Sequence, residues 1–204
     1  MCLSYHLIED FTIVNIMRQS CSRSHFSGVA APRQTFLVTV ADSSNGATEV
    51  LAVEWATPLS VRPPLFGISI SPNKHTSQMI RSAGVFTVNV PSTDILKQTV
   101  WAGTHTGRQH KDKITAAGLT SQRSGWNVNA VSIGEAVASF ECKVVNEIPV
   151  GNHVLFIGEV MSVDASDELF DRQRGSWHTE KIRSILRVAY DTYTTTNRET
   201  LSLN

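Results

Sequence analysis

The sequence predicts a mainly β protein, built as a small antiparallel barrel with a few short helices at its edges. The first observation is a run of about seven short segments that alternate apolar and polar residues and are separated by turn signals. The second is their Greek-key-like spacing, which is typical of compact antiparallel barrels. The third is that no GxGxxG, Walker A, GxSxG or HExxH pattern occurs, so a Rossmann or P-loop site is not expected.

Composition narrows the class of protein further. The chain has 204 residues, which suits one domain with extensions. Lys+Arg and Asp+Glu both number 18, so the basic excess of a nucleic-acid-binding surface is missing. No apolar run approaches the ~18 residues that span a bilayer, so no membrane partner is expected. Cys2, Cys21 and Cys142 lie far apart without a CxxC pair, which favours a reducing, cytoplasmic compartment over a disulfide framework or a zinc site.

The composition also divides the chain into three parts. We predict an N-terminal extension over residues 1–29, a barrel domain over residues 30–193 and a C-terminal tail over residues 194–204. The extension has no basic segment before its apolar residues, so a secretory signal is not expected. Its Arg- and Ser-rich stretch from Met17 leaves a transit-like peptide as an alternative to an extension that packs on the domain or frays.

The first predicted hairpin precedes a stretch of small residues. Residues 34–41 alternate as a strand, with Phe36, Val38 and Val40 on one face. Asn-Gly at 45–46 predicts a hairpin turn, and residues 49–55 form the returning strand. The small residues at 56–60 beside Pro58 would let a flat ligand approach the backbone closely. The simpler alternative is a strand end followed by a turn.

Residues 63–91 are the centre of the predicted site. They read as an apolar strand interrupted by Gly67, a polar turn, a helix capped by Thr76 or Ser77 and ended by Gly84, and a second strand. A helix N-terminus favours an anion, and Lys74 adds a full charge there. The turn therefore predicts a phosphate seat, made by Asn73, Lys74, His75 and Thr76. The alternative, a capped helix with a solvated lysine, is equally compatible with the turn by itself.

Two further groups are candidates for binding roles. Arg108, His110, Lys111 and Lys113 form a local basic cluster, which is either solvated, a phosphate clamp or a nucleotide contact. The histidines of this region are not spaced with other ligands, so no metal site is expected. His153 begins the strand 154–163 beside a turn glycine, where a structural donor role is the commoner one.

Taken in order, these stretches resemble a known family. The matching segments are AVEWATPLSVRPPLFGISI, SPNKHTSQMIRSAGVFTVNVP, DKITAAGLT and IGEAVASFECKVVNEIPVGNHVLFIGEV. They resemble the flavin reductase-like proteins with an FMN-binding split barrel, the group that includes flavoredoxins. The resemblance covers residues 30–193 and leaves the two ends of the chain outside it.

The resemblance implies a Greek-key split barrel, a homodimer, and FMN held near the dimer interface. It implies that the Asn73–Thr76 turn meets the FMN phosphate and that Lys113 reaches the phosphate or a neighbouring group. It implies that His153 approaches the nicotinamide of an electron donor. It also implies a wall for the flavin ring, made by Trp55, Ala56, Thr57, Pro58, Leu59 and Ser60.

The function that follows is an FMN-binding oxidoreductase that reduces its flavin with NADH or NADPH. No catalytic side chain is expected, because the flavin carries the hydride chemistry and the protein positions it. Two alternatives stay open. One is a flavoredoxin-type electron carrier that is reduced by a redox protein partner, and the other is a binding barrel that holds no flavin.

Overall fold

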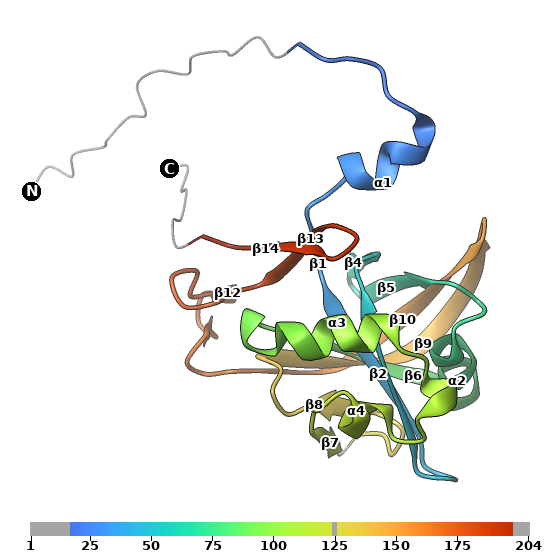
Figure 1. The fold of residues 1–204 in the computed structure, drawn as a ribbon. Helices are drawn as coiled ribbons and strands as arrows, with labels where there is room; N and C mark the ends of the chain where they lie inside the picture. Colours follow the sequence, from blue (N-terminus) through green and yellow to red (C-terminus); the bar gives the residue numbers. More distant parts are fainter. Residues whose placement is uncertain (1–16, 124–125, 198–204) are drawn as a thin grey trace, which may run out of the picture.

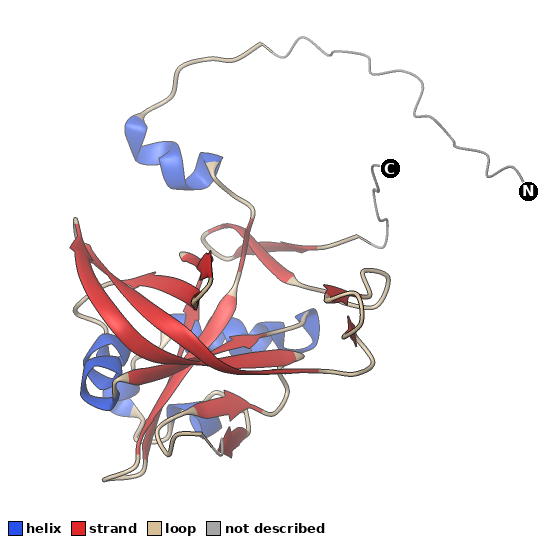
Figure 2. Cartoon of the chain, turned by 180° about the vertical axis from the view of Figure 1, so that it is seen from behind, coloured by secondary structure: helices blue, strands red, loops and turns tan. Residues whose placement is uncertain are grey.

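The computed structural model describes residues 17–123 and 126–197, and this part of the chain is mainly β with short helices, as predicted (Figures 1 and 2). Within it, seven strands form one antiparallel sheet in the order β3-β2-β6-β9-β10-β5-β4. These strands are β2 (Phe36–Asp42), β3 (Ala47–Val53), β4 (Ala56–Val61), β5 (Pro64–Ile70), β6 (Val85–Val90), β9 (Ala138–Val150) and β10 (His153–Ala165). The non-sequential order confirms the predicted Greek-key topology.

The barrel is split between its two edge strands. β3 and β4 are at opposite ends of the strand order, yet only Glu54 and Trp55 separate them in the chain. The three residue steps from Val53 to Ala56 reach about 10 Å at most, so the two edges must approach each other here and the sheet must curl. Trp55 O accepts the amide of Ser69 on β5 at 2.7 Å, which holds this crossing against the barrel.

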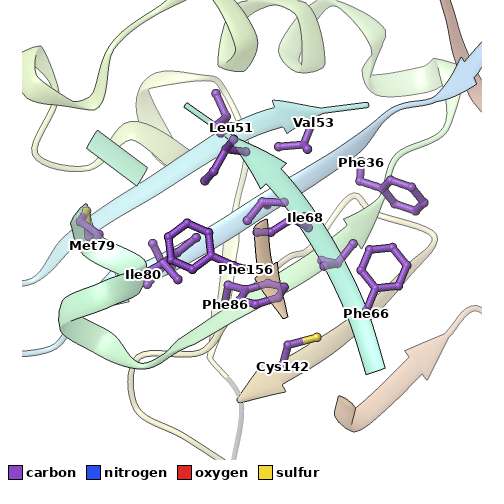
Figure 3. Packing of buried hydrophobic residues seen from close by; sticks show 14 of the residues in the cluster. Phe36, Leu51, Val53, Phe66, Ile68, Met79, Ile80, Phe86, Cys142 and Phe156 are labelled. Atoms are coloured by element: carbon purple, nitrogen blue, oxygen red, sulfur yellow. The ribbon is translucent and has the colours of Figure 1, made fainter. Parts of the chain in front are cut away.

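The interior of the barrel is filled by the inward faces of these strands. Phe36, Val38 and Val40 of β2 all belong to the interior cluster, so the predicted alternation of this strand is confirmed. Figure 3 shows Phe86 and Phe156 packed beside Ile80 of α2 (His75–Ala83) in the same cluster. Burial of such apolar area, at about 25 cal/mol per Å², is the main force that closes the barrel.

A second apolar layer covers the outer face of β2 and β3. Leu37 and Val50 point to this side, where they pack with Ile95, Ala102 and Ile114. The covering elements are η2 (Thr93–Ile95), α3 (Leu96–Thr104), α4 (Lys113–Ala116) and β8 (Val131–Ile133). The exposed strand β7 (Ser121–Arg123) pairs with β8. The loop after α3 contains η3 (Gly107–Gln109), and this loop returns to the start of α2.

Two glycines confirm their predicted roles. Gly84 ends α2 in the left-handed conformation, with φ of 67°. Gly67 permits close packing, because a Cβ there would lie 2.8 Å from Leu59 Cδ1. The local bulge lies on the neighbouring strand instead, between Pro58 and Ser60 of β4.

The β9–β10 hairpin is longer than its sequence predicts. Residues 148–153 read as a turn, but β9 continues through Val150 and β10 begins at His153, so only Gly151 and Asn152 form the turn. Pro149 is tolerated because β9 has lost its β6 partner beyond Lys143, so the proline lies in a segment paired on one side only. The hairpin extends beyond the rest of the sheet (Figure 1).

The remaining elements lie at the open end of the barrel. η1 (Arg23–His25) and α1 (Phe26–Val29) precede β1 (Arg33–Gln34), which pairs with the hairpin of β13 (Ile185–Ala189) and β14 (Thr192–Thr195). A small hairpin of β11 (Phe170–Asp171) and β12 (Ser176–Trp177) leads to them. None of the helices described is long and apolar enough to cross a membrane. Residues 1–16 of the predicted extension and 198–204 of the predicted tail lie outside the described residues.

Candidate functional site

The N-terminus of α2 is the first part of the candidate site. Lys74 is the N-cap residue, with extended backbone and no side chain that caps the helix. The predicted cap at Thr76 or Ser77 is therefore wrong. The helix begins earlier because Lys74 O already accepts the Ser77 amide at 3.1 Å, and the Ser77 hydroxyl donates to Ser71 O at 2.7 Å.

The missing cap leaves hydrogen-bond donors open. Among the described residues, no acceptor reaches the backbone amides of His75 and Thr76, which lie in the first turn. Free amides at the positive end of the helix dipole favour an anion. The turn residues Asn73, Lys74, His75 and Thr76 all line one small cavity of about 160 Å³, so the structure brings the predicted phosphate-binding group together.

The opposite wall of the small cavity comes from the loop after α3. Residues 104–107 and the side chain of Lys113 complete the lining. Gly107 has to be glycine at this point, because a Cβ there would lie 1.8 Å from Glu49 Oε2. The loop therefore approaches β3 as closely as backbone atoms allow.

Glu49 lies beneath the small cavity and organises it. Its side chain is 1% exposed, and its carboxylate accepts hydrogen bonds from three donors: Lys113 Nζ at 2.7 Å, His75 Nδ1 at 2.9 Å and the Val50 amide at 3.1 Å. We call Glu49, His75 and Lys113 the floor network. A buried carboxylate costs several kcal/mol unless it is paired and hydrogen-bonded. These three partners meet that requirement within the protein.

Lys113 is held as part of this floor. Its ammonium group also donates to Ala102 O at 3.0 Å, so it has two protein acceptors. Burial lowers the pKa of Lys113, the bond to Glu49 opposes that shift, and the nearby charge of Lys74 adds to the lowering. The predicted contact of Lys113 with a phosphate stays a prediction, since the ammonium lines the cavity but is already bonded.

A large cavity of about 780 Å³ adjoins the small one. Leu51 and Lys74 line both, so the two cavities share a boundary at the N-terminus of α2. Residues 51–55 line one side of the large cavity, and residues 69–71 line another. Residues of η1, α1 and β13 border the far side. The volume lies within the ~300–1,000 Å³ range of small-molecule sites.

An aromatic pair lies on the wall of the large cavity. Trp55 and His153 face each other with ring centroids 4.7 Å apart, and both line the cavity. Phe26 of α1 lies over Trp55 at 6.4 Å. Such an apolar, partly exposed wall suits a flat conjugated ring. Two predicted residues, one for the ring and one for the nicotinamide, are thus brought together.

The rest of the predicted ring wall lies elsewhere. Residues 56–60 belong to β4, the edge strand, and line neither of the two cavities. Their backbone pairs with β5 on one side, and Leu59 is 43% exposed. Their predicted contact with a flavin stays a prediction, and it would have to be made from the open edge of the sheet.

Several residues of the site were not predicted. Glu49 could have been found, because it alternates with Leu51 and Val53 on the inward face of β3, where a charged side chain needs a partner. The loop at 104–107 gave only a weak signal in its glycine and threonine content. Arg33 and Arg187, which line the far end of the large cavity, lie outside every motif that the sequence offers.

Comparison with known proteins decides the family. Residues 29–185 match the family described as "Flavin reductase like domain". The chain belongs to this family. The match covers most of the chain and contains the whole lining of the small cavity. The lining residues of the large cavity before residue 29 and after residue 185 lie outside the match.

Relatives of this flavin reductase-like chain have varied descriptions. An uncharacterised protein of Archaeoglobus fulgidus is 35% identical over 140 residues, which is 69% of this chain and 76% of that protein. An NADH-dependent FMN reductase of Streptomyces nodosus subsp. asukaensis is 26% identical and covers 78% of this chain and 85% of its own length. The solved flavoredoxin of Desulfovibrio vulgaris (Miyazaki F) is 25% identical, with a TM-score of 0.74 over 84% of this chain and 90% of that one.

Proposed function

We propose that this protein binds FMN and reduces it with NADH or NADPH. The observation that carries the proposal is the junction of the two cavities at Lys74, where a small polar seat for an anion opens into a larger space with an aromatic wall. FMN has the matching shape, a phosphate joined to a flat ring by a short chain. Membership of the flavin reductase-like family supports the same cofactor.

The residues divide the work of binding. The amides of His75 and Thr76, with the Lys74 ammonium, would hold the phosphate. Trp55 and His153 would border the ring or the donor that meets it. When bound, FMN supplies the electron-transfer chemistry, so the protein has to bind, orient and exclude water. The similar NADH-dependent FMN reductase supports a nicotinamide donor.

The test has two stages. Purified protein is titrated with FMN while flavin fluorescence is followed, and NADH and NADPH oxidation is then measured at saturating FMN. We expect FMN binding and turnover with at least one donor. A protein that binds no FMN would be a flavin-free barrel, which would overturn the proposal.

The similarity to flavoredoxin supports a second function, an electron carrier reduced by a redox protein. Stopped-flow reduction separates the two functions. Reduction of the FMN-loaded protein by NADH or NADPH within the time of steady-state turnover supports the enzyme. Slow reduction by both nucleotides, with fast reduction by a reduced ferredoxin, supports the carrier.

We propose further that the working form is a homodimer. Apolar side chains are exposed along the open edge strand and the long hairpin: Leu59, Val61, Val145, Ile148, Val150, Met161 and Val163. A second copy of the chain would cover such a surface. Light scattering after size-exclusion chromatography tests this, with Val163→Asp expected to give monomers, and a monomeric wild-type protein would contradict it.

A further inference from the structure

The far end of the large cavity is lined by two arginines, and one of them is only partly hydrogen-bonded within the described part of the protein. Arg33 of β1 and Arg187 of β13 are directly opposite each other in the strand register, so their side chains share one face. Both line the large cavity. Like charges placed opposite each other on a sheet are destabilising unless something compensates them.

Within the described residues, Arg187 is the one of the two arginines that pairs with an acidic side chain. Arg187 pairs with Glu54 at 2.9 Å and donates through Nε to Tyr190 O at 2.8 Å. No acidic side chain among the described residues pairs with Arg33, whose Nη1 donates to the carbonyl of Ser27. Its Nε is buried and has no acceptor in the described part of the chain, which is an unusual and costly arrangement.

The edge of the Arg33 guanidinium that contains the unpartnered Nε has a specific shape. Nε and Nη2 point the same way and form the fork with which arginine takes a carboxylate or a phosphate bidentately. With Nη1 fixed on the Ser27 carbonyl, this fork is oriented before any ligand arrives. Preorganisation of this kind is typical of a binding group.

The Arg33 end is separate from the seat at Lys74. Leu51 marks the boundary with the small cavity, whereas Glu54, three residues along, pairs with Arg187. Three residues of extended chain span about 10 Å. A ligand whose phosphate occupies the small cavity therefore does not use the Arg33 fork for the same group.

We propose that Arg33 is a second anion site in the large cavity. It binds a phosphate or carboxylate of the small molecule that exchanges electrons with the flavin. The proposal rests on the proposed function, which supplies the flavin and the need for a second ligand. Two sources share this chemistry: a dinucleotide phosphate and the carboxylate of a small organic acid.

The experiment uses FMN-loaded protein and unreactive probes. NADP⁺ tests the dinucleotide, benzoate tests the carboxylate, and benzamide is the neutral counterpart of benzoate. Binding is measured by calorimetry for the wild type, Arg33→Gln, Arg33→Lys and the control Arg172→Gln. Arg172 is 71% exposed, pairs with Asp167, and lines neither cavity.

We expect at least one anionic probe to bind the wild type and to lose about tenfold to a hundredfold in affinity in Arg33→Gln. Arg33→Lys keeps the charge without the fork and should recover part of that loss, while Arg172→Gln and benzamide show no change. A loss confined to NADP⁺ identifies the dinucleotide, and a loss confined to benzoate identifies the acid. Equal probe affinity in wild type and Arg33→Gln, or no anion binding to the wild type, overturns the proposal.

FMN and riboflavin titrations of the same variants separate this proposal from the proposed function. We expect the ratio of FMN to riboflavin affinity to be unchanged in Arg33→Gln. A collapse of that ratio would place Arg33 in the flavin phosphate site and overturn the second site. Failure of the wild type to bind FMN would overturn the proposed function, and the Arg33 site with it.

Discussion

The small cavity is lined by two lysines in contrasting environments, Lys113 in the floor network and Lys74 at the start of α2. Lys113 in the floor is 1% exposed and is bonded to Glu49 and to Ala102 O. Lys74 on the rim, at the start of the same cavity, has no ion-pair partner among the described residues. The comparison teaches that charge alone does not mark a ligand site. A lysine whose donors are met inside the protein supports the structure, and a lysine whose donors are open is available to a ligand.

The largest expected effect on stability comes from removing Glu49 from the floor network. Glu49→Ala removes the carboxylate and leaves the Lys113 ammonium buried without its counter-charge. Loss of one partner from a buried pair costs about 3–5 kcal/mol, so the free energy of unfolding should fall by that amount. Urea denaturation measures it.

The matched control is the exposed pair of Arg81 and Glu147 at the other end of α2. Glu147→Ala should cost less than about 1 kcal/mol, because water screens an exposed pair. Equal losses in the two variants would show that the floor network is not a buried electrostatic unit.

The next effect, on FMN affinity, comes from Lys74. Lys74→Ala should leave the free energy of unfolding nearly unchanged but weaken FMN by about one to two orders of magnitude, since a charge-assisted bond contributes about 1.5–3 kcal/mol. Riboflavin, which has no phosphate, should bind as before. Fluorescence titration with both ligands is the measurement, with Lys97→Ala on the exposed side of α3 as control. Equal weakening of FMN and riboflavin would make Lys74 a structural residue.

A third substitution tests whether the close contact between the loop 104–107 and Glu49 contributes to stability. Gly107→Ala puts a methyl group 1.8 Å from Glu49 Oε2, so either the loop or the carboxylate must move. Overpacking of this kind costs about 1–3 kcal/mol. Thermal unfolding should show the loss, and Gly28→Ala, where nothing lies within 4 Å of the new Cβ, should not. Unchanged stability in Gly107→Ala would mean that the loop shifts freely.

The smallest effect concerns the buried thiol of Cys142. Burial, with a contribution from Glu141, raises the pKa of Cys142 to about 12 from 9.0. Because the folded thiol holds its proton longer than the unfolded one, its contribution is complete below pH 9.0 and is lost as the pH rises toward 12. The slope is about 1.4 kcal/mol per pH unit. Urea titrations at pH 8 and pH 10 should show a smaller decline in Cys142→Val than in the wild type, and parallel declines would contradict the assignment.

Much of this fold was readable from local patterns, and the reason is physical. The alternation of β2 and the left-handed glycine after α2 depend on the neighbours of each residue, so the sequence predicts them well. The four residues of the predicted anion seat are contiguous, so the sequence could place them at one turn, and their contact with a phosphate stays a prediction. The pairing of Lys113 with Glu49 could not be predicted in this way, because Glu49 lies 64 residues away and only folding brings the two together.

The rest of the site depends on long-range register. Arg33 and Arg187 become neighbours through the pairing of β1 with β13, which no local pattern in a two-residue strand can announce. The displacement of residues 56–60 from the cavity has a similar origin. Their composition suits close approach, but the sheet order makes β4 an edge strand. Composition describes what a segment tolerates, whereas topology decides what it meets.

The short connection at Glu54 and Trp55, which lines the large cavity, limits how far the two edge strands can separate. These two residues are the whole connection between β3 and β4, the two edge strands of the split barrel. The distance between the end of β3 and the start of β4 is therefore limited by chain length, to about 10 Å. Substitutions at Glu54 or Trp55 would leave this limit unchanged, whereas one inserted residue would lengthen the connection between the two edge strands.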